Sequence, residues 1–255
     1  MTAVSEDASA AFVAKWQQRE PEMHLAEVFC PASGRLRFRA WGALLHELRE
    51  ALFELSDPRV TGIKTGWWAE ELIAMPNGQA RHPLTQALLG IDAPWQALGR
   101  ALLAHTDAEV RAGDTAQAVE LLLPAAKAVL AVEAAVFSAG MPENAARSLA
   151  VHWLLQRLPQ GLAGDDQARI PMHLYARHGL TAAEVAAGQG EALLRDWAGE
   201  LARVCPGPLC GAALIRRSRQ RFDQARLQRL ASGRGFTEPP APSTLWRAWR
   251  AARDA

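Results

Sequence analysis

Two glutamates one helical turn apart, Glu47 and Glu50, are residues whose type and spacing could support chemistry. Residues three positions apart lie on the same face of an α-helix, so the two carboxylates would point the same way. Paired carboxylates supply the hard oxygen ligands that Mg²⁺ binds. The adjacent Arg49 offers a different use, because its guanidinium could form a salt bridge with Glu50 or with another nearby acid. We favour the salt bridge and keep the metal site as the alternative.

Other familiar catalytic patterns are not formed by this sequence. His46 and Glu47 do not begin a His-Glu-x-x-His zinc-protease motif, because position 50 is a glutamate. Asp165 and Asp166 fall in a Gly-rich segment that predicts a loop, and we interpret them as solvated charges. The three cysteines match neither a disulfide framework nor a common zinc site, and no P-loop or Rossmann glycine run is found.

Two segments carry a recognisable order of residues. The first is Lys64-Thr65-Gly66-Trp67-Trp68-Ala69-Glu70-Glu71, followed by Gly78-Gln79-Ala80-Arg81-His82-Pro83-Leu84. The last is Arg169-Ile170-Pro171-Met172-His173-Leu174, with His178-Gly179-Leu180 after it. Together they resemble the squalene and phytoene synthases, all-helical enzymes that join two prenyl diphosphates head to head. The resemblance extends from Phe12 to Leu180, about two thirds of the chain.

The resemblance implies two acidic helices that hold Mg²⁺ against the substrate diphosphates. The first would contain Glu47 and Glu50, where His46-Glu47-Leu48-Arg49-Glu50 replaces the family's D-D-x-x-D. The second would fall at Trp153–Gln160, which has no acid and matches the family only at Arg157. The resemblance also implies a ligand pocket, for which the candidates are Leu45, Trp67, Trp68, Trp153 and Arg157. For the two adjacent tryptophans, one core residue and one partly exposed neighbour is an equally good interpretation.

A missing second acidic helix argues against the family's reaction, because Lewis-acid stabilisation of the departing diphosphate is the main contribution such an enzyme must make. We therefore expect a divergent, non-catalytic protein without a cofactor. It would bind an apolar or prenyl ligand, or a protein partner through its C-terminal helix. The alternative is an active Mg²⁺-dependent prenyltransferase in which Glu47, Glu50 and Asp165 or Asp166 hold the metal. A third hypothesis is recognition of an anionic lipid surface by Arg217 and its neighbours.

The elements that would position these residues are all helical. Ala, Leu, Arg and Glu dominate, and strand-like alternation is absent. We predict an all-α, isoprenoid-synthase-like bundle with a central cavity in residues 1–232, then a Pro/Gly linker and a Trp-bearing helix in residues 233–255. A capping box at Thr181 and Glu184 predicts a helix start. The other expected helices are 10–19, 22–29, 35–55, 58–74, 83–89, 95–106, 115–139, 142–158, 191–204 and 210–232.

Charge and hydropathy limit the partners. The formal net charge of +1 gives no overall field for binding nucleic acid. From Arg195 onward, twelve arginines stand against five acids, and we interpret them as a solvated Arg-rich helix face. The polar N-terminal residues do not resemble a secretory signal, so a cytoplasmic location is expected. The apolar stretch 119–141 is interrupted by charges, which predicts a buried helix and at most peripheral membrane contact.

Overall fold

The structure is a computed structural model that describes residues 3–55, 57–106, 111–158, 170–235 and 241–254. Its described residues form helices and no strand, so the predicted all-α class is confirmed. The helices are α1 (Ala3–Arg19), α2 (Pro21–Glu27), α3 (Arg35–Phe53), α4 (Pro58–Ala74), α5 (Pro83–Gln86), α6 (Trp95–Thr106), α7 (Thr115–Phe137), α8 (Ala145–Arg157), α9 (Met172–His178), α10 (Ala182–Glu184), α11 (Glu191–Val204), α12 (Leu214–Ala231) and α13 (Ala241–Arg253).

Local sequence signals place many of the helix ends. Pro21 is the first residue of α2, where its missing N–H costs nothing. The side chains of Asp57 and Asp114 accept backbone N–H groups at the starts of α4 and α7. The capping box of Thr181 and Glu184 is confirmed, with both reciprocal hydrogen bonds present. The predicted starts of α8 and α12 were early by three and four residues, respectively.

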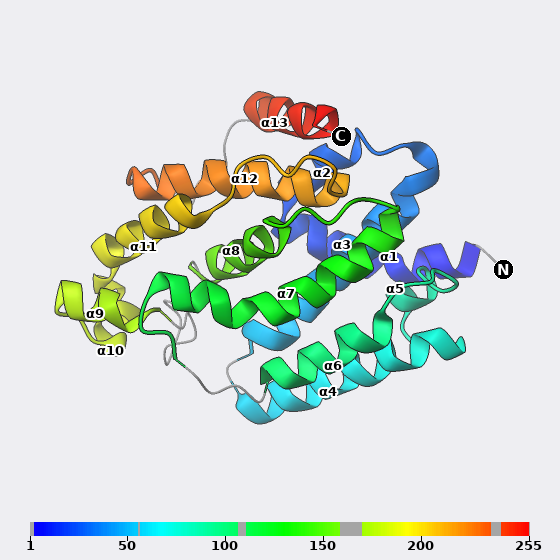
Figure 1. Ribbon diagram of the computed structural model, residues 1–255, viewed down its shortest axis with the longest axis horizontal. Coiled ribbons are helices and arrows are strands. Elements are labelled where there is room, and N and C mark those ends of the chain that lie inside the picture. Colours follow the sequence, from blue (N-terminus) through cyan, green and yellow to red (C-terminus); the bar gives the residue numbers. More distant parts are fainter. Residues whose placement is uncertain (1–2, 56, 107–110, 159–169, 236–240, 255) are drawn as a thin grey trace.

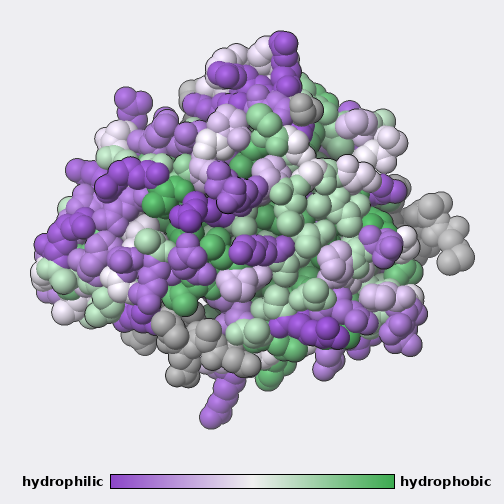
Figure 2. Space-filling view, in the orientation of Figure 1, coloured by the Kyte–Doolittle hydropathy of each residue, from purple (hydrophilic) through white to green (hydrophobic). Residues whose placement is uncertain are grey.

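The helices pack as one bundle (Figure 1). In Figure 1, α7 crosses the middle with α8 beside it, α4 and α6 lie together along the lower edge, and α13 covers α12 at the top. Gly99 allows α6 to approach α4 closely, since a Cβ there would lie 2.8 Å from the carbonyl oxygen of Ala69. Figure 2 shows hydrophilic residues gathered over α9 and α11, and a paler apolar area over α7.

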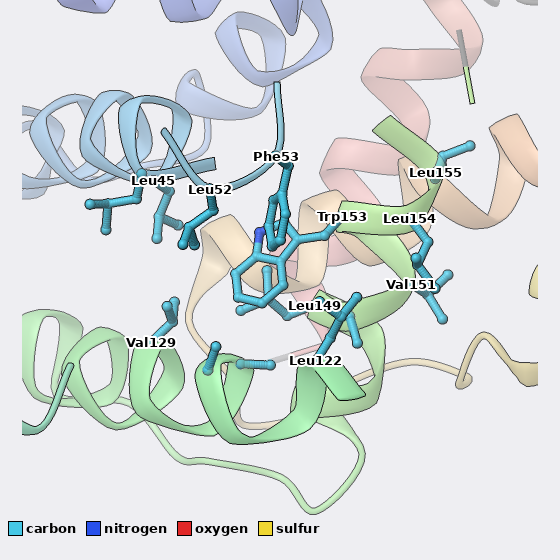
Figure 3. Close-up of a cluster of buried hydrophobic side chains, with 14 of the residues drawn as sticks. Leu45, Leu52, Phe53, Leu122, Val129, Leu149, Val151, Trp153, Leu154 and Leu155 are labelled. Carbon is cyan, nitrogen blue, oxygen red and sulfur yellow. The ribbon is translucent and has the colours of Figure 1, made fainter. Parts of the chain in front are cut away.

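The interior between α3, α7 and α8 is lined by apolar side chains that face one another (Figure 3). All the labelled residues are buried, but they lie on two sides of α8. Leu45, Leu52, Phe53, Leu122, Val129, Leu149 and Trp153 lie toward one another, whereas Val151, Leu154 and Leu155 lie on the far side of α8. The central cavity implied by the resemblance would lie in this interior and stays a prediction. Within the described residues, no helix combines the length and apolar content needed to span a bilayer.

The C-terminal helix α13 packs on the body of the bundle. It contacts α12 and α2 through its buried residues Thr244, Ala248 and Ala251. The division of the chain at residue 233 stays a prediction. Asp165 and Asp166, and the loop predicted around them, lie outside the described residues.

Candidate functional site

One face of α3 brings together His46, Glu47 and Glu50. Each of the three offers one ligand atom, and these atoms lie within 4.8 Å of one another. Glu50 lies three residues after Glu47 and four after His46, the two spacings at which helical side chains are neighbours, and α1 and α4 pack against α3. The spacing alone would suit a metal ion, so what else contacts these atoms decides their use.

Two lysines from neighbouring helices contact the carboxylates. Lys15 of α1 donates to Glu47 at 2.8 Å and also pairs with Glu50. Lys64 of α4 donates to Glu50 at 2.8 Å and lies 3.9 Å from the second oxygen of Glu47. Burial opposes ionisation of Glu50, but hydrogen bonds from the two ammonium groups outweigh it and lower its pKa to about 2. The same carboxylates outweigh the effect of burial on Lys15 and raise its pKa. The cluster therefore holds its own counter-ions.

Arg49 occupies the ring nitrogen of His46 that would otherwise be able to bind a metal ion. The Nη2 of Arg49 lies 3.0 Å from the Nδ1 of His46, and a guanidinium can only donate, so Nδ1 accepts. The proton of the neutral ring is then on Nε2, the nitrogen 4.0 Å from Glu50. Burial first, and the charge of Arg49 second, lower the pKa of His46 to about 4. Neither ring nitrogen offers a lone pair to a metal while Arg49 remains in place.

These residues do not fit Mg²⁺ in the arrangement described. A divalent cation at Glu47 and Glu50 would have to displace two ammonium groups and would gain no nitrogen ligand from His46. The prediction that these glutamates form salt bridges is confirmed, with Lys15 and Lys64 as their partners. Arg49 pairs with a nearby acid, Glu54, at 3.0 Å, and also with Glu20 at 3.2 Å.

The end of α8, where the second acidic site was expected, contains aromatic and cationic groups. Trp153 is buried and packs on Phe53, with 5.4 Å between ring centroids. The guanidinium carbon of Arg157 lies 4.0 Å from the Phe53 ring centroid, a cation–π contact. Leu45, also on α3, lines the same interior (Figure 3). Three of the five predicted pocket residues therefore belong to the region between α3 and α8.

Trp67 and Trp68 lie elsewhere, at the junction of α4 and α5. Trp68 is buried, whereas Trp67 is 37% exposed, so one is a core residue and the other a partly exposed neighbour. Both pack around His82, at centroid distances of 4.8 Å for Trp68 and 5.9 Å for Trp67. Trp68 nevertheless belongs to the same buried hydrophobic core as Leu45 and Trp153.

Glu71 of α4 binds the segment Arg81–Thr85, which leads into α5. Its fully buried carboxylate accepts the backbone N–H groups of Arg81 at 2.7 Å and His82 at 2.8 Å, and the hydroxyl of Thr85 at 2.6 Å. Burial would raise the pKa of Glu71, but these hydrogen bonds outweigh it and lower the pKa. The carboxylate thus fixes the turn that leads into α5, a structural use of the segment that carries the family resemblance.

Sequence reasoning missed a set of buried ion pairs. Glu133 of α7 accepts two hydrogen bonds from Arg216, at 3.0 and 2.8 Å, and one from the indole of Trp41 at 2.8 Å. Glu20 lies between Arg49 and Arg219, whose charges overcome burial and lower its pKa. A signal for one of these was available, because Glu133 interrupts an otherwise apolar stretch and would be costly there without a partner.

The interpretation of the arginines of α12 as a solvated face is wrong for three of them. Arg216, Arg217 and Arg219 are 1%, 9% and 3% exposed, because α12 is enclosed by α2, α8, α11 and α13. Arg217 donates to the carbonyl oxygens of Ala251 at 2.8 Å and Ala212 at 2.6 Å. This removes Arg217 as a group that could contact a lipid surface.

Three pockets in the described part of the chain are formed by other residues. One, of about 140 Å³, is enclosed by α2, α12 and α13 and is lined in part by Glu22, Phe222 and Arg247. Another lies between α11 and the end of α12, and a third between α1 and α3. None of these three is lined by the predicted pocket residues. Comparison with protein-family models and with curated proteins finds no match to this chain.

Proposed function

We propose that this chain is a divergent squalene/phytoene synthase-like protein that binds an apolar or prenyl ligand, or a protein partner, without catalysing prenyl transfer. The observation that carries the proposal is the pairing of Glu47 and Glu50 with Lys15 and Lys64. The ammonium groups of Lys15 and Lys64 lie beside the carboxylates that, in an enzyme of this family, would bind Mg²⁺. Without a Lewis acid, the departing diphosphate lacks the stabilisation on which the reaction depends.

The interior between α3 and α8 supports ligand binding as the remaining role. Its lining combines apolar and aromatic side chains, including Leu45 and Trp153, with one cationic group, Arg157. Such a lining suits the hydrocarbon of a prenyl chain and one anionic or polar end. The family resemblance adds support, because it implies a prenyl pocket for which Leu45, Trp153 and Arg157 are candidates.

The alternative function is an active Mg²⁺-dependent prenyltransferase. The convergence of His46, Glu47 and Glu50 within 4.8 Å favours it. It requires Lys15 and Lys64 to leave the carboxylates when the metal and the substrate bind. It also requires a second set of acids, for which the sequence offers Asp165 and Asp166.

Calorimetric titration separates the two functions. The purified chain is titrated with farnesyl and geranylgeranyl diphosphate, with and without Mg²⁺, and then assayed for pyrophosphate release. We expect no Mg²⁺ dependence and no pyrophosphate, in the wild type and in Glu47→Gln/Glu50→Gln alike. Glu191→Gln, an exposed glutamate also paired with a basic residue, is the matched control. Mg²⁺-dependent heat with pyrophosphate release, lost in the double variant alone, would establish the enzyme instead.

The same titration distinguishes the two non-catalytic roles. Binding that is independent of Mg²⁺, and also seen with farnesol, would support an apolar ligand in the α3–α8 interior. Leu45→Trp and Trp153→Ala would then alter its affinity. Absence of heat with every prenyl compound would leave the protein-partner role.

A further inference from the structure

Helix α13 has two different faces. Thr244, Ala248 and Ala251 are buried against α12 and α2. On the opposite side, Leu245, Trp246 and Trp249 are 42%, 55% and 40% exposed. Two exposed tryptophans and a leucine within five residues are unusual, because these side chains are normally buried by the fold itself. In Figure 1 the helix lies at the outer edge of the bundle, with α12 beneath it.

The charge of α13 is positive throughout. The guanidinium of Arg250 lies 5.0 Å from the ring centroid of Trp246, and that of Arg253 lies 4.9 Å from the ring centroid of Trp249. Arg247 adds a third charge, and the helix contains no acid. The acid that follows it, Asp254, already accepts from Arg221 of α12. Within α13, the charged side chains beside the exposed apolar residues are therefore all cations.

The helix is held flat against the body of the protein. Buried Arg217 of α12 donates to the carbonyl oxygen of Ala251 at 2.8 Å, near the end of α13. The exposed face of this thirteen-residue helix therefore points outward along the whole helix, and the helix axis runs along the protein surface. Amphipathic helices that bind membranes lie in this way, parallel to the surface, with apolar residues at the headgroup level and Lys or Arg among the phosphates.

We propose that the α13 face, formed by Leu245, Trp246, Trp249, Arg250 and Arg253, docks the protein on an anionic phospholipid surface. Tryptophan is enriched at the interface between headgroups and acyl chains, and arginine complements the negative charge of the headgroups. The surface hypothesised earlier around Arg217 is thereby replaced, because Arg217 anchors α13 and does not reach solvent.

Binding of this kind should be reversible and sensitive to salt. Each arginine near an anionic surface contributes about fivefold in affinity, so removing both Arg250 and Arg253 should weaken binding about 25-fold. Raising the salt concentration screens the same attraction. Removing the tryptophans should weaken binding at every salt concentration, since burial of apolar surface is not screened.

Sedimentation of the full-length chain with vesicles tests the proposal. Vesicles of phosphatidylcholine alone are compared with vesicles of phosphatidylcholine and phosphatidylglycerol, at low and high salt. We expect binding only to the anionic vesicles, with a blue shift of tryptophan fluorescence. Trp246→Ala/Trp249→Ala should weaken this binding at both salt concentrations, and Arg250→Gln/Arg253→Gln should weaken it about 25-fold at low salt. All the replaced side chains are exposed, and unchanged melting temperatures would show that the fold is retained.

Matched controls exist in the same chain. Trp67 is 37% exposed and has Arg81 over its ring at 5.6 Å, so Trp67→Ala removes a similar group from a different surface. Arg37→Gln/Arg59→Gln removes two exposed charges away from α13. Both controls should bind vesicles like the wild type.

Three results would overturn the proposal. The first is absence of binding to the anionic vesicles at low salt. The second is binding that the α13 variants and the control variants reduce equally. The third is concentration-dependent self-association that Trp246→Ala/Trp249→Ala abolishes, which would assign the face to a second copy of this chain.

Discussion

Replacement of Arg216 by methionine should be among the most destabilising single changes in this chain. Arg216 and Glu133 are 1% and 2% exposed, so neither charge reaches water. Arg216→Met removes two of the three hydrogen bonds to the Glu133 carboxylate and leaves only the indole of Trp41. Breaking a buried ion pair by removing one partner costs about 3–5 kcal/mol. For a domain of this size, that loss lowers the melting temperature by about 6–20 °C.

A double-mutant cycle separates loss of the pair from loss of packing. Arg216→Met/Glu133→Leu removes both charges, and well-packed apolar pairs often replace buried ion pairs at little cost. The remaining penalty is the unpaired indole N–H of Trp41, about 1–3 kcal/mol. The double variant should therefore be more stable than Arg216→Met, although it carries one more substitution. Thermal and urea unfolding followed by circular dichroism would measure all members of the cycle.

The control is an exposed ion pair with similar geometry. Arg195 donates to Glu191 at 3.0 Å on the surface of α11. Arg195→Met should change stability by about 0.5 kcal/mol or less. The reasoning fails if Arg216→Met costs no more than Arg195→Met, or if the two substitutions at positions 216 and 133 are simply additive.

Three further predictions follow from buried or crowded positions. The folded state lowers the pKa of His46 from 6.5 to about 4, so the unfolded chain binds more protons between these pH values. The free energy of unfolding should therefore fall by up to about 3 kcal/mol as the pH drops from 6.5 to 4. In urea titrations at several pH values, the free energy of unfolding should depend less steeply on pH in His46→Gln than in the wild type. An unchanged slope would contradict this. Gly42→Ala would place a Cβ 2.3 Å from the ring of Trp16 and should destabilise the fold by about 1–3 kcal/mol. In Gly62→Ala the added Cβ meets nothing within 4 Å, so the substitution should stabilise α4 by about 0.5–1 kcal/mol. Equal melting temperatures for the two variants would refute this contrast. Glu71→Gln should cost about 1–3 kcal/mol and speed amide exchange at Arg81 and His82, while exposed Glu70→Gln should do neither.

The helices were predictable because their signals are local. Apolar periodicity and the proline and aspartate caps at Pro21, Asp57 and Asp114 are read within a few residues of where they act. The predicted helix at 58–74 has the observed bounds, and the predicted helix at 35–55 ends within two residues of α3. Helix class and many helix ends therefore followed from the sequence alone, whereas the start of α1 at Ala3 and the helix α9 did not.

The arginines of α12 were not predictable in this way. Alternation of arginine with leucine or phenylalanine looks like an amphipathic helix, but helices from the whole chain enclose α12. Arg219 meets Glu20 across 199 positions, and Arg216 meets Glu133 across 83. No local pattern encodes which distant acid will be folded against a given arginine, so burial of these charges appears only in three dimensions.

The candidate site was predicted in part for the same reason. The placement of Glu47 and Glu50 on one face of a helix is a local property and was correct. Their partners, Lys15 and Lys64, come from α1 and α4, so the sequence favoured the adjacent Arg49 instead. The identity of the counter-ion is what bears on metal binding, and it depends on the packing of three helices.

Metal binding at the α3 carboxylates tests the central claim most directly. Mn²⁺ can stand in for Mg²⁺, and electron paramagnetic resonance reports the free ion as the chain is titrated. The wild type should leave Mn²⁺ free, because Lys15 and Lys64 already neutralise the two carboxylates. Glu47→Gln/Glu50→Gln should also leave it free, because it lacks these carboxylates. Stoichiometric binding by the wild type that is lost in Glu47→Gln/Glu50→Gln would contradict the account and restore a metal-dependent enzyme.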